Sequence, residues 1–148
     1  MYISNIDHQK VQALTALVNV MPGQIVSRTL AQNKAVSITL FAFDKGTEIS
    51  THESTGDAMV QVLEGTGCFT VDGKEYLVHP GEVLVMPANV PHAVSAPEAF
   101  KWVLTVVFPE GFKKYWRICR HFAGCCWAVS SAWRALARLA RRRRRRPA

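Results

Sequence analysis

The sequence lacks a long hydrophobic run, and it lacks a secretory type of N-terminus. The longest apolar stretch, residues 122–133, contains Ser130 and Ser131 and is only about a dozen residues long. A membrane-spanning helix needs about 20 apolar residues. No positively charged segment followed by an apolar core opens the chain. These absences predict a cytoplasmic protein without a transmembrane segment.

Cysteine is also scarce, with four residues in 148. Cys68, Cys119, Cys125 and Cys126 fit neither the paired spacing of a zinc site nor the framework of a disulfide-stapled secreted domain. We therefore expect no cysteine-based metal centre. Cys68 is interpreted as a small buried apolar residue of a strand.

Acidic residues are missing from one part of the chain altogether. Residues 1–110 have a net charge of −5, whereas residues 111–148 contain no Asp or Glu and have a net charge of +12. The Arg-, Cys- and Trp-rich extension 111–148 is therefore not expected to belong to the domain. One interpretation is an amphipathic helix for anionic lipid or nucleic acid. The favoured interpretation is that this extension is the translation of an unselected reading frame. Such an extension would bind polyanions only nonspecifically, so no specific nucleic-acid partner is expected.

The first 23 residues predict a short helix and a lead-in to the domain. Asp7 can cap a helix in which Val11, Leu14, Leu17 and Val18 recur at helical spacing. The helix would end before residues 21–23, Met-Pro-Gly, and pack across one face of the domain.

From residue 24 onward the pattern changes to short β-branched and aromatic runs that are separated by turn residues. Asp72-Gly73, between two such runs, is a strong hairpin signal. The predicted strands are residues 24–30, 36–43, 57–63, 68–71, 74–78, 83–86, 92–95 and 100–107. No segment among them is typical of a helix, so the fold class is all-β, a sandwich or barrel.

Two segments of this region combine turn residues with histidine. The first contains Gly46, His52 and Gly65, and the second contains Gly81, Pro87 and His92. They resemble the two characteristic motifs of the cupin superfamily, and the match covers about residues 24–108. The resemblance implies a small single-domain cupin of the type-2 conserved-barrel kind. Its fold would be a cupin-like double-stranded β-helix, a jelly-roll barrel over residues 24–110. It also implies a homodimer that pairs or exchanges edge strands.

Cupins of this kind usually hold a metal with four residues, and the sequence supplies two of them, His52 and His92. Ser54 stands where the second His of the first motif is expected, and Ala58 stands where its Glu is expected. Two imidazoles would hold a divalent ion only weakly, because open metal sites generally use three protein ligands. The resemblance thus leaves a weakly bound iron, manganese, nickel or zinc ion as a hypothesis, with no cofactor established.

Two acidic residues lie close to the first motif, and the second motif departs from the family pattern at two positions. Strand alternation places Glu53 and Asp57 on the face opposite His52, unless the intervening loop bulges. In the second motif, Asn89 replaces a Gly and Ala96 replaces an Asn.

Other pocket candidates follow from period-two alternation alone. Gln61 is a polar amide between two valines and needs partners if it points inward. Phe43 and Trp102, at the mouths of the barrel, would suit a partly apolar ligand. The preferred hypothesis is a small-molecule binding module with His52 and His92 as polar anchors. The alternative is an enzyme on a small metabolite: a metal-dependent oxygenase or isomerase, or a metal-free isomerase with histidine acid–base chemistry.

Overall fold

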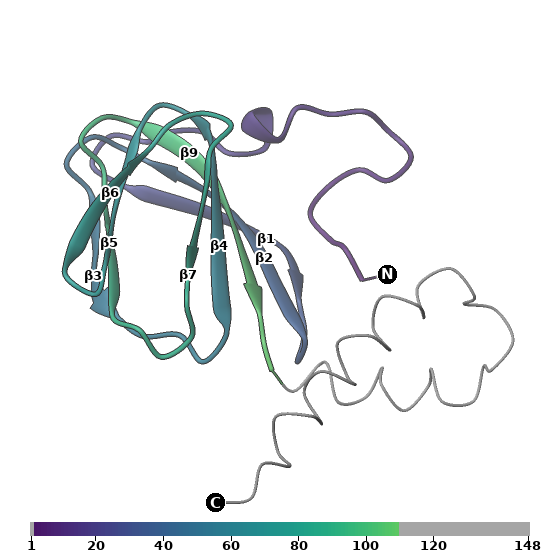
Figure 1. Ribbon diagram of the computed structural model, residues 1–148. Helices are drawn as coiled ribbons and strands as arrows, with labels where there is room; N and C mark the ends of the chain where they lie inside the picture. The colour runs from purple at the N-terminus through teal and green to yellow at the C-terminus, as the bar shows by residue number, and fades with distance from the viewer. Residues whose placement is uncertain (1, 110–148) are drawn as a thin grey trace, which may run out of the picture. The chain divides into compact units, whose positions relative to one another are not determined.

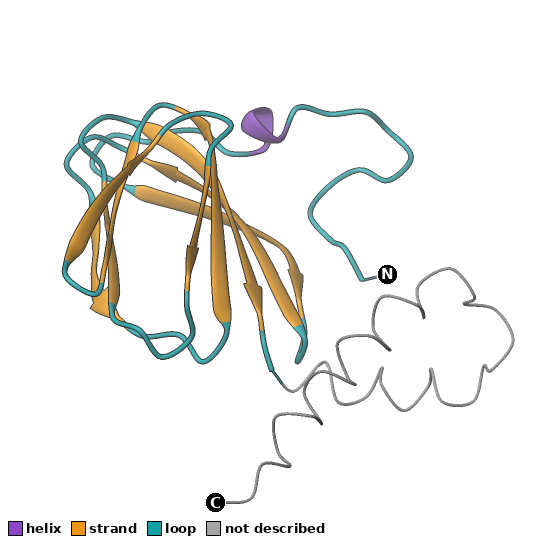
Figure 2. Cartoon of the chain, in the orientation of Figure 1, coloured by secondary structure: helices purple, strands orange, loops and turns teal. Residues whose placement is uncertain are grey.

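The computed structural model describes residues 2–109, and nearly all of its regular structure is β-strand (Figure 2). A single helical turn precedes the strands. The elements are η1 (Leu14–Leu17), β1 (Ile25–Gln32), β2 (Val36–Phe43), β3 (Glu48–His52), β4 (Asp57–Glu64), β5 (Gly67–Val71), β6 (Lys74–Val78), β7 (Val83–Met86), β8 (His92–Ser95) and β9 (Phe100–Val107). The all-β prediction is confirmed.

The strands form two antiparallel sheets that face each other (Figure 1). One sheet has five strands in the order β1-β2-β9-β4-β7, and the other has four in the order β3-β8-β5-β6. Neighbours in a sheet are mostly distant in the sequence, as in a jelly roll, and the side chains between the sheets make the core. The predicted cupin-like barrel is therefore the observed architecture.

Strand β3 was not among the predicted strands. Its sequence, Glu-Ile-Ser-Thr-His, contains one aliphatic residue, Ile49, and most of its side chains are exposed. Such a strand has no apolar alternation, which is the signal that identifies a half-buried strand. It pairs with β8 at one edge of the four-stranded sheet.

The predicted N-terminal helix is present only as the turn η1, a 3-10 turn, so its predicted extent from Asp7 is wrong. Asp7 pairs with Lys10 at 3.0 Å, and Val11 is fully exposed. The residue that precedes the turn, Ala13, has no side-chain acceptor for the free backbone N–H groups. The segment does cover the outside of the barrel, because Val18 is buried in a small cluster with residues of β1 and β2.

Four aromatic side chains fill one part of the space between the sheets: Phe43, Phe69, Phe100 and Trp102 are at most 2% exposed. Their ring centroids lie 5.1–6.2 Å apart, mostly in tilted or edge-to-face contacts. Aromatic pairs favour such arrangements over face-to-face stacking. This packing fills that part of the barrel interior.

Within residues 2–109, no helix is long and apolar enough to cross a membrane. The predicted basic extension, residues 111–148, and its nonspecific contact with polyanions lie outside the described residues.

Candidate functional site

His52 and His92 are direct cross-strand neighbours on β3 and β8. Their ring centroids lie 4.5 Å apart with an interplanar angle of 63°. His92 is 3% exposed, whereas His52 is exposed. The two histidines of the two sequence motifs therefore do come together, as the motif resemblance predicts.

A β-bulge in β3 determines to which face of the sheet the His52 side chain points. The register shifts between Ile49 and His52, so three steps along β3 match two steps along β8, from Val94 to His92. In a regular strand, residues three apart point to opposite faces. The extra residue of this β-bulge cancels one alternation, so both Ile49 and His52 line the same cavity.

Each imidazole makes a hydrogen bond to the backbone carbonyl of the residue two positions earlier in the chain. Nδ1 of His52 lies 2.9 Å from the carbonyl oxygen of Ser50, and Nδ1 of His92 lies 2.8 Å from that of Val90. A carbonyl oxygen can only accept, so Nδ1 must carry the proton in both rings. In the neutral rings, Nε2 then carries the free lone pair. Both rings thus offer the same nitrogen to a bound group.

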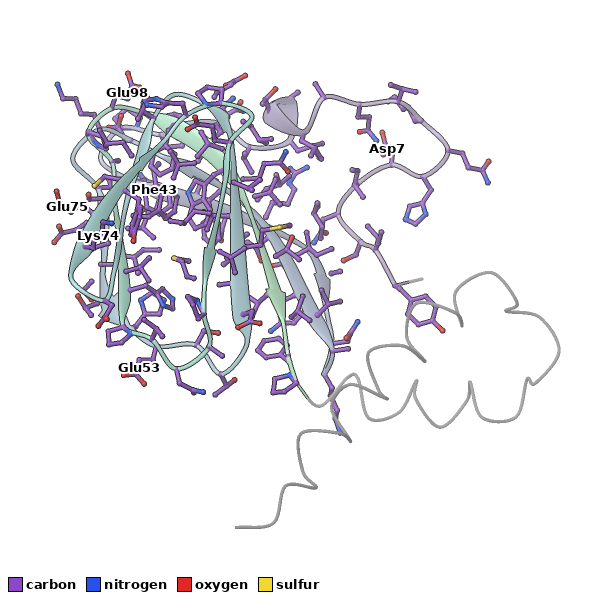
Figure 3. All side chains as sticks on the ribbon, viewed as in Figure 1. Asp7, Phe43, Glu53, Lys74, Glu75 and Glu98 are labelled. Carbon is purple, nitrogen blue, oxygen red and sulfur yellow. The ribbon has the colours of Figure 1, made fainter. Side chains whose placement is uncertain are left out.

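The two imidazoles belong to the wall of a cavity of about 440 Å³ between the sheets. The β3–β4 loop contributes Glu53, Ser54 and Thr55, and Figure 3 shows Glu53 at one end of the barrel, away from the region of Phe43. Aliphatic and aromatic side chains make most of the remaining wall: Phe41, Ile49, Ala58, Met86, Val94, Trp102, Leu104 and Val106. This is an apolar chamber with a few polar groups.

The other predicted site residues are placed as follows. Trp102 lines the cavity and is 2% exposed. Phe43 is fully buried in the aromatic core and does not belong to the cavity wall, so its expected position at the mouth is wrong. The prediction that Gln61 lines the pocket is also wrong. Its neighbours Val60 and Val62 occupy the inward positions of β4, so the amide is exposed on the outside.

Several wall residues were missed by the sequence reasoning. Ile49 was missed together with its strand. Leu104 and Val106 follow Trp102 at period two on β9, and this alternation could have identified them. Glu53 was expected on the opposite face, but β3 ends at His52, and alternation does not extend into a loop.

A tight metal site does not fit the residues present. Ala58 has no donor atom, and the Ser54 hydroxyl accepts a hydrogen bond from the Gly56 N–H at 3.2 Å. The Asp57 carboxylate accepts one from the Ala88 N–H at 2.9 Å, on the outward side of β4. Among residues 2–109, no group of three or more His, Cys, Asp or Glu side chains could hold a metal ion. Glu53 also lines the cavity but forms no such group with the two imidazoles, so the cavity offers two ligands where three are the usual minimum.

A second cavity, about 570 Å³ and more open, lies between the N-terminal segment and β1. Its wall is formed by Asn5, Ile6, Asp7, Gln12, Leu17 and Arg28. Three of these residues are exposed and three are partly buried, and they include neither motif histidine. We therefore regard the chamber between the sheets as the candidate site.

Fold and site together define a small jelly-roll barrel with an imidazole pair in an apolar chamber. The family model described as "Cupin domain" matches residues 39–108. An RmlC-like cupin from Desulfovibrio desulfuricans is 30% identical, with a TM-score of 0.59, and the match covers 68% of this chain and 97% of that one. The chain therefore belongs to the cupin superfamily.

Two further solved structures resemble the chain. The conserved SPY1581 protein of unknown function from Streptococcus pyogenes is 49% identical, with a TM-score of 0.72 over 74% of this chain and 96% of that one. A cupin superfamily protein from Desulfitobacterium hafniense is 29% identical, with a TM-score of 0.70 over 73% and 99%. No curated protein matches the sequence.

Proposed function

We propose that the protein binds a small molecule in the chamber between the sheets, with His52 and His92 as its polar anchors. The observation that carries the proposal is the imidazole pair, 4.5 Å between centroids, on the wall of an otherwise apolar cavity of about 440 Å³. Sites for small molecules are typically chambers of about 300–1,000 Å³ with a few well-placed polar groups.

The chemistry of the pair favours a ligand with a hydrogen-bond donor. Because both Nδ1 atoms donate to carbonyl oxygens, the neutral rings present Nε2 as acceptors. A hydroxyl group is a matching donor, and the apolar wall would hold a hydrocarbon body. Phenols and apolar alcohols combine these two features.

Removal of both imidazoles is expected to weaken binding of a simple phenol such as para-ethylphenol. The double variant His52→Ala/His92→Ala should raise its Kd roughly fivefold, because the single hydroxyl proton makes one hydrogen bond to the pair and a net hydrogen bond contributes about 1 kcal/mol. Isothermal titration calorimetry measures the change. His79→Ala is the matched control, since His79 is exposed and bonds to Thr66, which is also outside the chamber. An unchanged Kd in the double variant, or binding of neither phenols nor apolar alcohols by the wild type, would contradict the proposal.

A second candidate function is an isomerase without metal, in which an imidazole moves a proton. Its support is the fixed tautomer of the two rings, since a defined Nε2 lone pair is what a general base needs. Measuring turnover by the histidine variants distinguishes the two functions. Under this alternative, His52→Ala or His92→Ala abolishes turnover of a hydroxy-carbonyl substrate rather than only weakening its binding.

We also propose that the protein forms a homodimer through the β7 edge patch, defined as Met59, Val83 and Val85. Strand β7 is the last strand of its sheet, and Val83 and Val85 are 57% and 52% exposed. Met59, directly opposite Val85, is 40% exposed. An uncharged apolar edge invites pairing, whereas the edge strand β6 of the other sheet carries Lys74 and Glu75. A second copy of the chain is the occupant that this argument favours.

A charge in the patch is expected to separate the dimer. Val85→Lys should halve the molar mass measured by size-exclusion chromatography with light scattering, because a buried unpaired ammonium group is costly. Leu77→Lys is the control, since Leu77 is also exposed, at 60%, on the other sheet. A wild-type monomer, or a Val85→Lys dimer, would refute this interface.

A further inference from the structure

The chamber wall carries a negative charge that no cation of the described chain neutralises. Apart from the two imidazoles, Glu53 is the one ionisable residue among the described residues that line the chamber. The ion pairs of residues 2–109 are Lys10–Asp7 and Lys101–Glu64, so within this part of the chain Glu53 has no ion-pair partner. Its carboxylate is therefore available to a positively charged group of a ligand.

The charge lies at the mouth of the chamber. The exposed members of the wall are His52, Glu53 and Thr55, which follow one another closely in the chain. Figure 3 shows Glu53 at one end of the barrel. Further inside, His92 is 3% exposed and Trp102 is 2% exposed. From the interior outward, a ligand thus meets an apolar wall, then the imidazole pair and then a carboxylate.

We infer that the chamber binds an amino alcohol with an apolar body, in which the hydroxyl and ammonium groups are attached to neighbouring carbon atoms. This inference rests on the proposed function and specifies its ligand. The hydroxyl donates to Nε2 of the imidazole pair, and the ammonium group pairs with Glu53 at the mouth. The spacing between the two groups is short because His52 and Glu53 are consecutive residues. The hydrocarbon body occupies the apolar interior.

A cation fits the mouth better than an anion does. No Lys or Arg belongs to the chamber wall, and a ligand carboxylate would lie beside the like charge of Glu53. A cation deep in the chamber would pay a large desolvation cost. An ammonium group beside the exposed Glu53 and Thr55 keeps part of its hydration, so it avoids most of that cost.

The test compares three compounds with one skeleton on the full-length protein by isothermal titration calorimetry. The first is phenylalaninol, an amino alcohol whose amine is protonated at about pH 7. Its neutral partner has hydrogen in place of the amine, and its acidic partner has a carboxylate there. Phenylalaninol should bind roughly threefold more tightly than the neutral alcohol, because an exposed ion pair contributes little free energy. The acid should bind more weakly than either.

Glu53→Gln keeps the size of the side chain and removes its charge, so the threefold preference should fall to about onefold while the neutral alcohol binds as before. Glu48→Gln is the matched control, since Glu48 is also exposed, lies on β3 and does not belong to the chamber wall. It should keep the preference. In the wild type, about 1 M salt should reduce the preference, because the Debye length falls to about 3 Å.

The outcomes separate this inference from the proposed function. If the neutral alcohol binds through His52 and His92 but the amine gives no advantage, or gives the same advantage in Glu53→Gln, this inference is wrong and the proposed function stands. The same holds if para-ethylphenol binds and phenylalaninol does not. If the wild type binds none of these compounds, both are wrong.

Discussion

Ser54→His combined with Ala58→Glu is expected to turn the chamber into a tight site for a divalent transition metal. The two positions are those at which the cupin motif normally supplies the second His and the Glu, and both line the chamber beside His52 and His92. The change would raise the number of protein donors from two to four and add a negative charge. The Kd for zinc or nickel should fall on the order of 100-fold or more, because even outer groups around a metal change affinity 10–100-fold. Competition titration with a chromogenic chelator measures it.

The matched control places an imidazole and a carboxylate together on the outside of the other sheet. Leu77→His puts an imidazole two residues from Glu75 on the exposed face of β6 and should leave metal affinity near the wild-type value. Metal content after purification without chelator gives a second readout. If the chamber variant gains no more metal than the control, or if the wild type already holds one equivalent that Ala58→Glu does not tighten, our account of the ligand set is wrong.

Gly65→Ala is expected to destabilise the protein strongly, by about 3 kcal/mol or more. Gly65 has a φ of +70°, a conformation that costs a residue with a Cβ about 1–2 kcal/mol. A Cβ there would also collide with the carbonyl oxygen of Ala99 and with backbone and Cβ atoms of Phe100. Overpacking of that kind adds about 1–3 kcal/mol, since backbone cannot move aside as a flexible side chain can. Urea denaturation followed by circular dichroism measures the free energy of unfolding.

Gly73→Ala separates the cost of the positive φ from the cost of the steric collision. Gly73 also has a positive φ, +75°, but no atom lies within 4 Å of the position of an added Cβ. This variant should therefore lose only the conformational part, about 1 kcal/mol. An equal decrease in the free energy of unfolding in the two variants would show that the close approach to Ala99 and Phe100 contributes nothing to the destabilisation.

The sequence predicted the strands best where apolar residues alternate along a run that is bounded by turn-forming residues. All eight predicted strands are present, because their β-branched and aromatic residues point into the barrel, as in β4, where Ala58, Val60 and Val62 are buried. The meeting of His52 and His92 was also predictable, but only through the family motifs. Nothing in local composition indicates that residues 40 positions apart become cross-strand neighbours.

The remaining errors have particular causes. Strand β4 has apolar residues on both faces, including the exposed Met59, so composition alone could not decide whether Gln61 points inward. The predicted N-terminal helix relied on spacing, but an isolated short helix is marginal without caps and packing, and only the turn near the buried Val18 is present. The bulge that directs His52 toward the chamber depends on pairing with β8, which no local pattern encodes.

The cross-strand pairing of the two histidines also has a consequence for how the protein can be redesigned. Their separation is set by the ladder between β3 and β8, while the loop that follows β3 contributes Glu53, Ser54 and Thr55 to the chamber wall and is bonded to the loop that precedes β8. One backbone bond, from the Asn89 N–H to the Ser54 carbonyl oxygen at 2.7 Å, ties these loops together. Loops tolerate changes of length and sequence far better than ladders do. Grafting new loops at the rim would therefore alter which molecules enter while the anchoring pair keeps its geometry.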